Sequence, residues 1–322
     1  MHAARSLASL ALTLALAAGC GAAPGADAPS PYIPGFTPPA TPAGYQRFVT
    51  PILTGLPSGS DTIRCQWIMA PPTEDMYVTA VAGEQSKGGH HIVLYANKVV
   101  EDVGTSRDCT VDDMLQIGFL GAIGGEGMST TSGQIPDGVA FKLPKGRALM
   151  ANTHFINATP ASFDGQGVID VKFVDRAAVK QVADLFTSLN TTFEIPAGKA
   201  GTADANCVFG ADMSFFRFAN HMHGYGSSVY SEVVHGDGSK QDLVRDDHWL
   251  AEQMFDFRFE NWPLDKPLVI KKGETLHTHC EWQNSTAGVL SFPSEMCVIF
   301  GFFVPGSGGQ IVCQDGSWPS GR

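Results

Sequence analysis

The chain has 322 residues, is 43% hydrophobic and only 16% charged, and carries a formal net charge of −11 at pH 7. The excess of acidic side chains argues against nucleic acid as a partner, because its phosphates need a basic surface. The apolar content excludes a mainly disordered chain, and the lack of further long apolar runs excludes a multispanning membrane protein. Seven cysteines, an odd number, and ten histidines are the unusual features of the composition.

Residues 1–20 have the layout of a secretory signal, with Arg5 followed by an apolar run and then small residues. The segment Ala17-Ala-Gly-Cys20 resembles the lipobox of bacterial lipoproteins, in which the cysteine is lipidated. We therefore expect a lipoprotein signal peptide, lipidation of Cys20, and an exported protein that touches a membrane only through this lipid anchor. Gly21 after the cysteine favours the outer membrane of a Gram-negative bacterium, facing the periplasm. An ordinary cleavage site beside a chance cysteine is the alternative.

Residues 21–44 are rich in proline and glycine and contain a single charged residue, Asp27. Such a composition cannot bury enough apolar surface to fold, so it predicts a semi-extended tether.

From residue 45 onward the hydrophobic pattern has a period of two, which is typical of half-buried strands. The expected strands, which alternate with glycine-rich turns, are 76–81, 92–95, 168–174, 214–218, 228–234 and 298–304. Residues 176–189 alone have an ambiguous, partly helical periodicity. The sequence predicts an all-β protein with two antiparallel jelly-roll-like β-sandwich domains in tandem, over residues 45–176 and 177–322.

His221 and His223 have the spacing that places two side chains on the same face of a strand. Two imidazoles placed in this way can chelate one metal ion. Two histidines on the surface of an exposed strand are the alternative.

His90 and His91 are adjacent, and neighbours on a regular strand point to opposite faces. Binding to one ion therefore requires a bend, for which the preceding Gly88-Gly89 provides conformational freedom. By itself this pair is equally well explained as structural, and His154 alone is best explained as a buried histidine of a sheet.

The order of these groups along the chain carries more information than any one of them. Cys65, His90-His91, His154, His221-x-His223 and Glu295-Met296-Cys297 follow one another over residues 60–315. In this order the chain resembles the copper type II, ascorbate-dependent monooxygenases, the family of peptidylglycine α-hydroxylating and dopamine β-monooxygenases.

The resemblance implies two copper ions per chain and an ascorbate-type reductant. His90, His91 and His154 would hold an electron-transfer copper in the first domain. His221, His223 and Met296 would hold the oxygen-activating, catalytic copper in the second. A thioether beside two imidazoles independently favours Cu(I) over zinc. The implied activity is hydroxylation of a C–H bond of a small molecule with O2.

The resemblance also implies a pairing for the six cysteines that remain once Cys20 is lipidated, whereas counting alone allows fifteen. The implied disulfides are Cys65–Cys109, Cys207–Cys313 and Cys280–Cys297.

Residues that bind the substrate of peptide-hydroxylating members are replaced here by Ala219, Val298 and Phe300. Without a partner for a peptide carboxylate, we expect a fairly apolar small-molecule substrate, although Arg217 lies one strand step before Ala219 and could substitute in part.

His277 and His279 match no ligand of the family. They are explained either as exposed strand histidines or as part of a third metal site.

Two other functions remain open at this point. One is a non-catalytic copper-binding lipoprotein on the same scaffold, and the other is a jelly-roll module that binds ligands such as glycans. The sequence indicates neither the substrate nor the oligomeric state.

Overall fold

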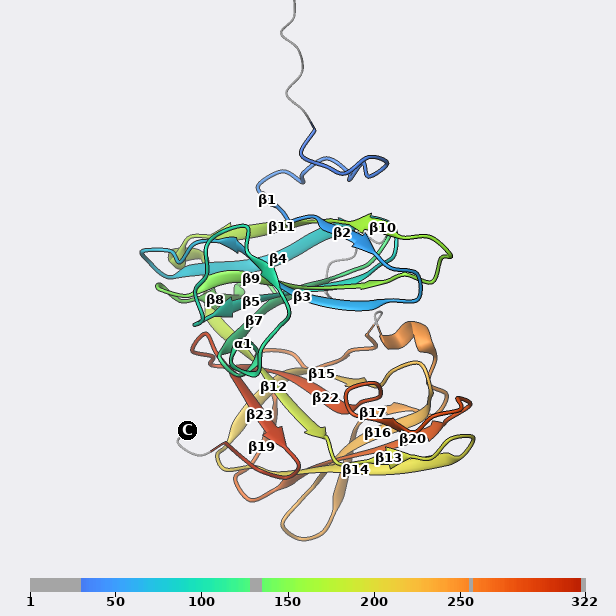
Figure 1. Cartoon of the computed structure of the whole chain (residues 1–322). Coiled ribbons are helices and arrows are strands. Elements are labelled where there is room, and N and C mark those ends of the chain that lie inside the picture. The colour runs from blue at the N-terminus through green and yellow to red at the C-terminus, as the bar shows by residue number, and fades with distance from the viewer. Residues whose placement is uncertain (1–29, 128–134, 255–256, 320–322) are drawn as a thin grey trace, which may run out of the picture. The chain divides into compact units, whose positions relative to one another are not determined.

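The computed structural model describes residues 30–127, 135–254 and 257–319. Apart from Ser30 and Pro31, these residues belong to one unit, Tyr32–Arg322. Strands dominate this unit and most of them pair in an antiparallel manner (Figure 1). The predicted all-β class is confirmed, and each of the six predicted strands lies within an observed one.

The N-terminal sandwich has two layers. One is formed by β1 (Gln46–Val49), β11 (Gly167–Val174), β4 (Met76–Gln85) and β8 (Val139–Leu143), which are the N-terminal part of a ten-stranded sheet that spans both sandwiches. The other is a five-stranded sheet of β6 (Ser106–Arg107), β3 (Asp61–Met69), β9 (Ala148–Ile156), β5 (Gly89–Asn97) and β7 (Ile117–Gly124). A short sheet of β10 (Phe163–Gly165) and β2 (Leu53–Leu56) accompanies them. The inward-facing residues of both layers, such as Val78, Leu94, Leu149 and Val171, form one buried core.

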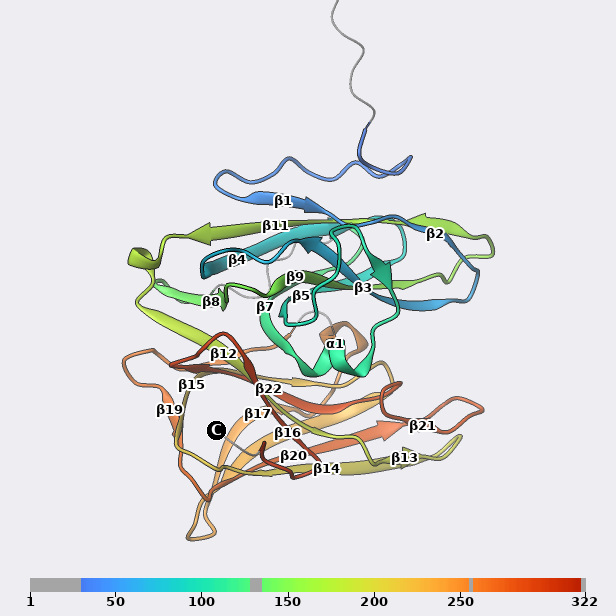
Figure 2. The same ribbon diagram turned by 60° about the vertical axis from the view of Figure 1, so that its left-hand side comes forward.

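The C-terminal sandwich also has two layers (Figure 2). One consists of β12 (Gln181–Asn190), β22 (Cys297–Val304), β15 (Met213–His221) and β18 (Glu260–Asn261), with β19 (Leu268–Ile270) on β15 and β23 (Gln310–Gln314) on β12. The other is a four-stranded sheet of β14 (Ala200–Val208), β20 (Thr275–Gln283), β16 (Gly226–Val234) and β17 (Lys240–Asp246). A two-stranded sheet joins β13 (Glu194–Ile195) to β21 (Leu290–Ser291). Aromatic rings fill much of the core between the layers, among them Phe186, Phe215 and Phe218.

Strand β12 connects the two sandwiches. Its first residues, Gln181–Ala183, pair in parallel with β8, and the rest of the strand pairs with β22 and β23. Phe302 of β22 also contacts Phe119 of β7 and Phe141 of β8, with ring centroids 5.6 and 5.8 Å apart. Hydrogen bonds and aromatic packing therefore run from one sandwich into the other.

The ambiguous segment 176–189 forms a 3-10 turn, η1 (Arg176–Ala178), followed by β12. The domain boundary predicted at 176–177 falls in this turn and stays a prediction. The other helical elements are α1 (Val111–Leu115) and η2 (Ala251–Met254). Across the described ranges, none of the helices has the length and apolar character needed to cross a membrane.

The last part of the predicted tether packs on the first sandwich. Ile33 and Phe36 are buried and contact Val168 of β11, and the backbone N–H of Ile33 donates to Oε1 of Gln166 at 2.9 Å. A few apolar side chains within a proline-rich segment are enough to anchor it, which the composition of the segment did not reveal. The predicted signal peptide and Cys20 lie outside the described residues.

The structure contains the three disulfides that the resemblance implied, Cys65–Cys109, Cys207–Cys313 and Cys280–Cys297. Each joins residues that belong to the same predicted sandwich. The Cys280–Cys297 bond ties β20 to the start of β22, directly beside Met296.

Candidate metal centres

A β-bulge brings His90 and His91 to one place. Gly89 pairs with Phe155 and His91 with His154, so His90 is the extra residue of β5 opposite β9. A bulge reorients the side chains on either side of it, which removes the strict alternation of a regular strand. Gly88, with a φ of +72°, precedes the bulge in a conformation that favours glycine. The bend expected at Gly88-Gly89 is therefore present.

Gly125, which directly follows β7, packs so closely against the bulge that no larger residue fits at its position. A Cβ atom on Gly125 would lie 2.1 Å from the carbonyl oxygen of Gly89 and 2.8 Å from that of His90. The backbone N–H of Glu126 donates to the same Gly89 oxygen at 3.0 Å. The segment after β7 thus holds the backbone of the two histidines from the side opposite β9.

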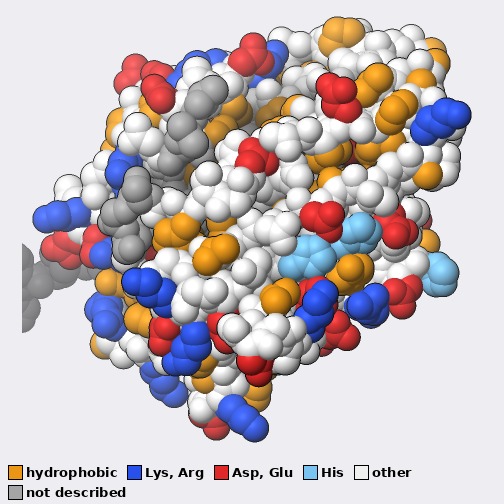
Figure 3. Space-filling model, turned by 90° about the horizontal axis from the view of Figure 1, so that it is seen from below, with side chains coloured by type: hydrophobic (Ala, Val, Ile, Leu, Met, Phe, Trp, Pro, Cys, Tyr) orange, Lys and Arg blue, Asp and Glu red, His pale blue; other side chains and the backbone are white. Residues whose placement is uncertain are grey.

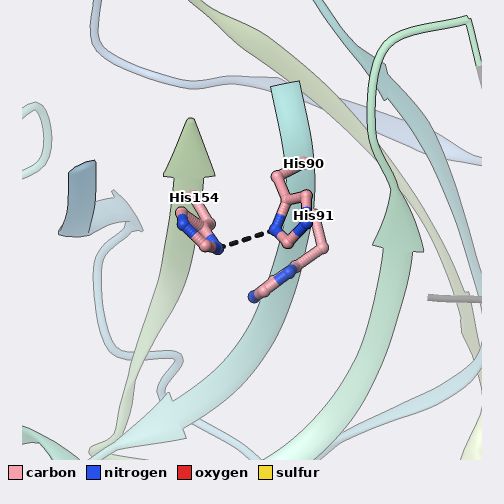
Figure 4. Close-up of side chains that lie close together, drawn as sticks. All are labelled: His90, His91 and His154. Carbon is pink, nitrogen blue, oxygen red and sulfur yellow. Dashed lines mark hydrogen bonds between the residues drawn. The ribbon is translucent and has the colours of Figure 1, made fainter. Parts of the chain in front are cut away.

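The rings of His90, His91 and His154 converge from two neighbouring strands (Figure 4). The ring centroids of His90 and His91 lie 4.4 and 5.0 Å from that of His154, and one ring nitrogen of each histidine lies within 4.8 Å of the other two. Nδ1 of His90 is 2.8 Å from Nδ1 of His154. Three nitrogen donors at this separation fit a single metal ion.

Asp61 determines which nitrogen of His154 is available. Its Oδ1 atom lies 2.5 Å from Nε2 of His154, and an ionised carboxylate can only accept a hydrogen bond. Nε2 therefore carries the proton. In the neutral ring Nδ1, which faces His90, keeps the lone pair that can bind a metal ion. A carboxylate on the far nitrogen is the usual support of a metal-binding histidine.

Burial keeps these histidines neutral. The pKa of His90 is lowered to about 2, mainly by burial and then by the charges that His154 and His91 would carry. Burial, followed by His154 and His223, lowers the pKa of His91 to about 3. Burial also lowers the pKa of His154, although Asp61 opposes this shift. Neutral imidazoles are the form that binds metal ions, so protons compete weakly at this group.

The second group lies where β15 ends. His221 is the last residue of the strand and His223 lies beyond it, so the expectation that both belong to one regular strand is wrong for His223. Their ring centroids are nevertheless only 5.2 Å apart. The turn that follows, rather than the strand itself, positions the second ring.

Hydrogen bonds fix His223 through both its side chain and its backbone. Nδ1 donates to the carbonyl oxygen of Ser294 at 2.9 Å, which leaves Nε2 as the free electron donor of the neutral ring. Its backbone N–H donates to Glu295, and its carbonyl oxygen accepts from Nε1 of Trp249 at 2.9 Å. No sequence pattern predicts the Ser294 contact, because its acceptor is a backbone carbonyl, which every residue has.

Glu295 connects the His223 turn to the segment that carries Met296. The carboxylate is fully buried and accepts from the backbone N–H groups of His223 and Tyr225 and from Nε1 of Trp282, at 2.8 to 3.1 Å. In the antiparallel register of β15 and β22, His221 lies opposite Val298. His223 also bonds to Ser294 and Glu295, so the segment that carries Met296 lies beside the His223 turn, and the Cys280–Cys297 disulfide follows Met296 directly.

The His221 ring has two features that fit a bound ion. Its Nδ1 atom is buried and has no hydrogen-bond partner among the described residues. Leaving a buried polar atom unpaired is costly, and coordination of the ring offsets that cost. Burial also lowers the pKa of His221 well below its usual value, with smaller contributions from His223 and His91. The rings of Phe257 and Phe300 lie 5.5 and 5.6 Å away, so the surroundings are apolar.

The two groups influence each other electrostatically. A charge on His223 lowers the pKa of His90, His91 and His154, and a charge on His91 lowers that of His221. Positive charge gained by one group therefore disfavours positive charge on the other.

Comparison with known proteins supports the resemblance for the C-terminal part of the chain. Residues 182–317 match the family model of the copper type II ascorbate-dependent monooxygenase, C-terminal domain. The matched range contains His221, His223 and Met296, and lies after His90, His91 and His154. No curated protein matches the chain.

Two solved structures show a distant likeness. N-glycanase F (PNGase F) is 11% identical, with 83% of this chain and 97% of that chain covered and a TM-score of 0.34. PBCV-1 VP54, fitted into a reconstruction of the virophage Sputnik, is 7% identical, with 82% and 94% covered and a TM-score of 0.32. Likenesses at this level say nothing about activity.

Proposed function

We propose that this protein is a copper-dependent monooxygenase of the copper type II, ascorbate-dependent family. His90, His91 and His154 would hold one copper ion, and His221, His223 and Met296 the other. The observation that carries the proposal is the assembly of His221, His223 and the Glu295–Cys297 segment at one sheet edge, within the range that matches the family model.

The proposed reaction inserts one atom of O2 into a C–H bond of the substrate, and the other atom leaves as water. Two electrons from an ascorbate-type reductant and two protons complete the balance. Copper, when bound, supplies the oxygen activation and one-electron chemistry that side chains lack. Burial lowers the pKa of His90, His91, His154 and His221. Asp61 fixes the tautomer of His154, the Ser294 carbonyl fixes that of His223, and apolar rings surround His221.

The surroundings of His221 favour an apolar substrate over a C-terminal glycine peptide. Val298 lies opposite His221 in the sheet, and Phe257 and Phe300 flank its ring. Arg217, the possible substitute partner for a carboxylate, donates from Nε to Asn261 at 2.7 Å and lies over the ring of Phe259. We propose that these contacts hold Arg217 in the wall of the site.

We further propose that the mature protein is exported and carries a lipid on Cys20, in the outer membrane of a bacterium facing the periplasm. The signal-like layout of residues 1–20 supports this location. The three disulfides agree with an oxidising compartment.

The test is ascorbate-driven O2 consumption coupled to product formation, measured on copper-loaded protein with a panel of small apolar substrates. Met296→Ile removes the thioether at similar volume, and Met76→Ile on β4 is the matched control. We expect product with the native protein and the control, and at least about a hundredfold less with Met296→Ile. Copper binding without product from any substrate would instead identify a non-catalytic copper-binding lipoprotein.

A further inference from the structure

The outer face of the four-stranded sheet carries another histidine cluster, which shares no residue with the two groups described above. His277 and His279 alternate outward on the central strand β20, whose intervening residues are buried. Asp204 of β14 lies directly opposite His279, and Glu232 of β16 lies opposite His277 on the other side. Three adjacent strands therefore present these four side chains on one face.

The side chains are in direct contact. Oδ1 of Asp204 lies 2.8 Å from Nε2 of His277 and 2.8 Å from Nδ1 of His279. Nδ1 of His277 lies 2.9 Å from Oε1 of Glu232. The three atoms contributed by Asp204, His277 and His279 all lie within 4.8 Å of one another.

Counting hydrogen-bond donors shows that a neutral His277 ring cannot satisfy both of its carboxylate contacts. Both ring nitrogens of His277 face carboxylate oxygens, which only accept hydrogen bonds, but a neutral imidazole has a single N–H. If that N–H points to Glu232, then Nε2 of His277 directs a lone pair at Oδ1 of Asp204. This contact is satisfied either by a second proton on the ring or by a metal ion that both atoms bind.

We propose that Asp204, His277 and His279 form a third metal site, which takes a divalent d-block cation such as Zn²⁺. The donors are two imidazole nitrogens and one carboxylate oxygen, a set that suits Zn²⁺ or Cu²⁺. A site with this donor set lacks the soft sulfur that Met296 offers and disfavours Cu(I). Glu232 then holds the far nitrogen of His277, as a carboxylate does behind many metal-binding histidines.

The neighbouring charges favour a cation as well. Oε1 of Glu281 lies 3.5 Å from Nε2 of His279, and Lys240 pairs with Glu232 at 2.7 Å. Arg245 lies over the ring of Tyr230, which contacts the rings of both histidines. The cluster thus contains three carboxylates and one directly paired lysine. On the face seen in Figure 3, histidine side chains lie beside acidic and basic ones.

Access and rigidity also suit the site. The Asp204 side chain is 49% exposed, whereas those of His277 and His279 are 17% and 21% exposed, so solvent reaches the cluster from the Asp204 side. His279 immediately precedes Cys280, whose disulfide to Cys297 fixes the strand. Preformed ligands lose little freedom when an ion binds.

The test is a Zn²⁺ titration of the full mature chain after both copper groups are loaded with Cu(I) under anaerobic, reducing conditions. Isothermal titration calorimetry should show about one Zn²⁺ per chain, and Co²⁺ should give a visible d–d absorption band. Asp204→Asn and His279→Ala should weaken Zn²⁺ binding by more than about tenfold, and Glu232→Gln by about ten- to a hundredfold. His248→Ala, at an exposed histidine outside the cluster, should change nothing.

Asp204 lies on the surface, so Asp204→Asn is expected to fold, and circular dichroism checks this for each variant. Zn²⁺ binding that His279→Ala leaves unchanged would overturn the proposal, as would the absence of binding to the native chain. Imidazole NMR gives a second measure, because a doubly protonated His277 that persists at pH 8 with Zn²⁺ present would contradict the site. None of these results depends on monooxygenase activity.

Discussion

Nδ1 of His90 lies 2.8 Å from Nδ1 of His154, with the far nitrogen of His154 engaged by Asp61. Two ring nitrogens that face each other at this distance share one hydrogen or one metal ion. A β-bulge at His90 makes the approach possible, and His91 completes the group from the same strand.

Replacing Asp61 tests the support of this group. Asp61→Asn removes the charged acceptor that fixes the His154 tautomer, and we expect copper affinity at the first group to fall by about ten- to a hundredfold. Competition with a Cu(I) chelator measures the change. Asp137→Asn, at another exposed aspartate, is the control and should leave the affinity unaltered.

Replacing Gly125 tests the bulge itself. In Gly125→Ala the new Cβ would meet the Gly89 carbonyl oxygen at 2.1 Å, so the backbone beside His90 has to move. We expect loss of copper from the first group and retention at the second, measured as copper per chain. Gly236→Ala, where a Cβ meets nothing within 4 Å, is the matched control. Full copper content in Gly125→Ala would show that the bulge is dispensable.

Replacing Glu295 tests the link between His223 and Met296. Gln has one acceptor oxygen where Glu has two, so Glu295→Gln turns an amide N–H toward a buried donor of Tyr225, or toward those of His223 and Trp282. We expect a loss of about 1–3 kcal/mol in the free energy of unfolding, together with weaker copper binding at the second group. Urea denaturation measures the first effect, with Glu252→Gln on η2 as the exposed control. An unchanged unfolding free energy would mean that Glu295 is not a structural link.

The metal-free protein should lose stability as the pH falls below about 6.5, the ordinary histidine pKa. In the folded state burial lowers the pKa of His90 to about 2 and that of His91 to about 3. Between these values and 6.5 the unfolded chain binds protons that the folded chain does not, so the free energy of unfolding decreases with falling pH. Denaturation at pH 7.5, 6.5 and 5.5 measures the slope, which should be shallower in His91→Gln. An identical slope in that variant would contradict the assignment.

The sequence predicted the strands well because alternation of apolar and polar residues reports burial on one face directly. It placed His90, His91 and His154 together only by resemblance, since the bulge that aligns them depends on pairing with β9. Asp61 is 93 residues from His154, and Asp204 is 73 and 75 residues from His277 and His279, so no local pattern links these contacts. Glu295 stood within a recognised motif, yet its buried role depends on three donors from two other segments, the His223–Tyr225 turn and β20.

The copper content of the protein, loaded with Cu(I) and washed under anaerobic reducing conditions, decides whether the two histidine groups hold copper. Reducing conditions exclude a contribution from the Asp204, His277 and His279 cluster, whose donors disfavour Cu(I). We predict about two copper ions per chain, about one in His154→Ala and about one in Met296→Ile. Zinc in place of copper, or a copper content that neither substitution changes, would show that these two groups are not copper sites.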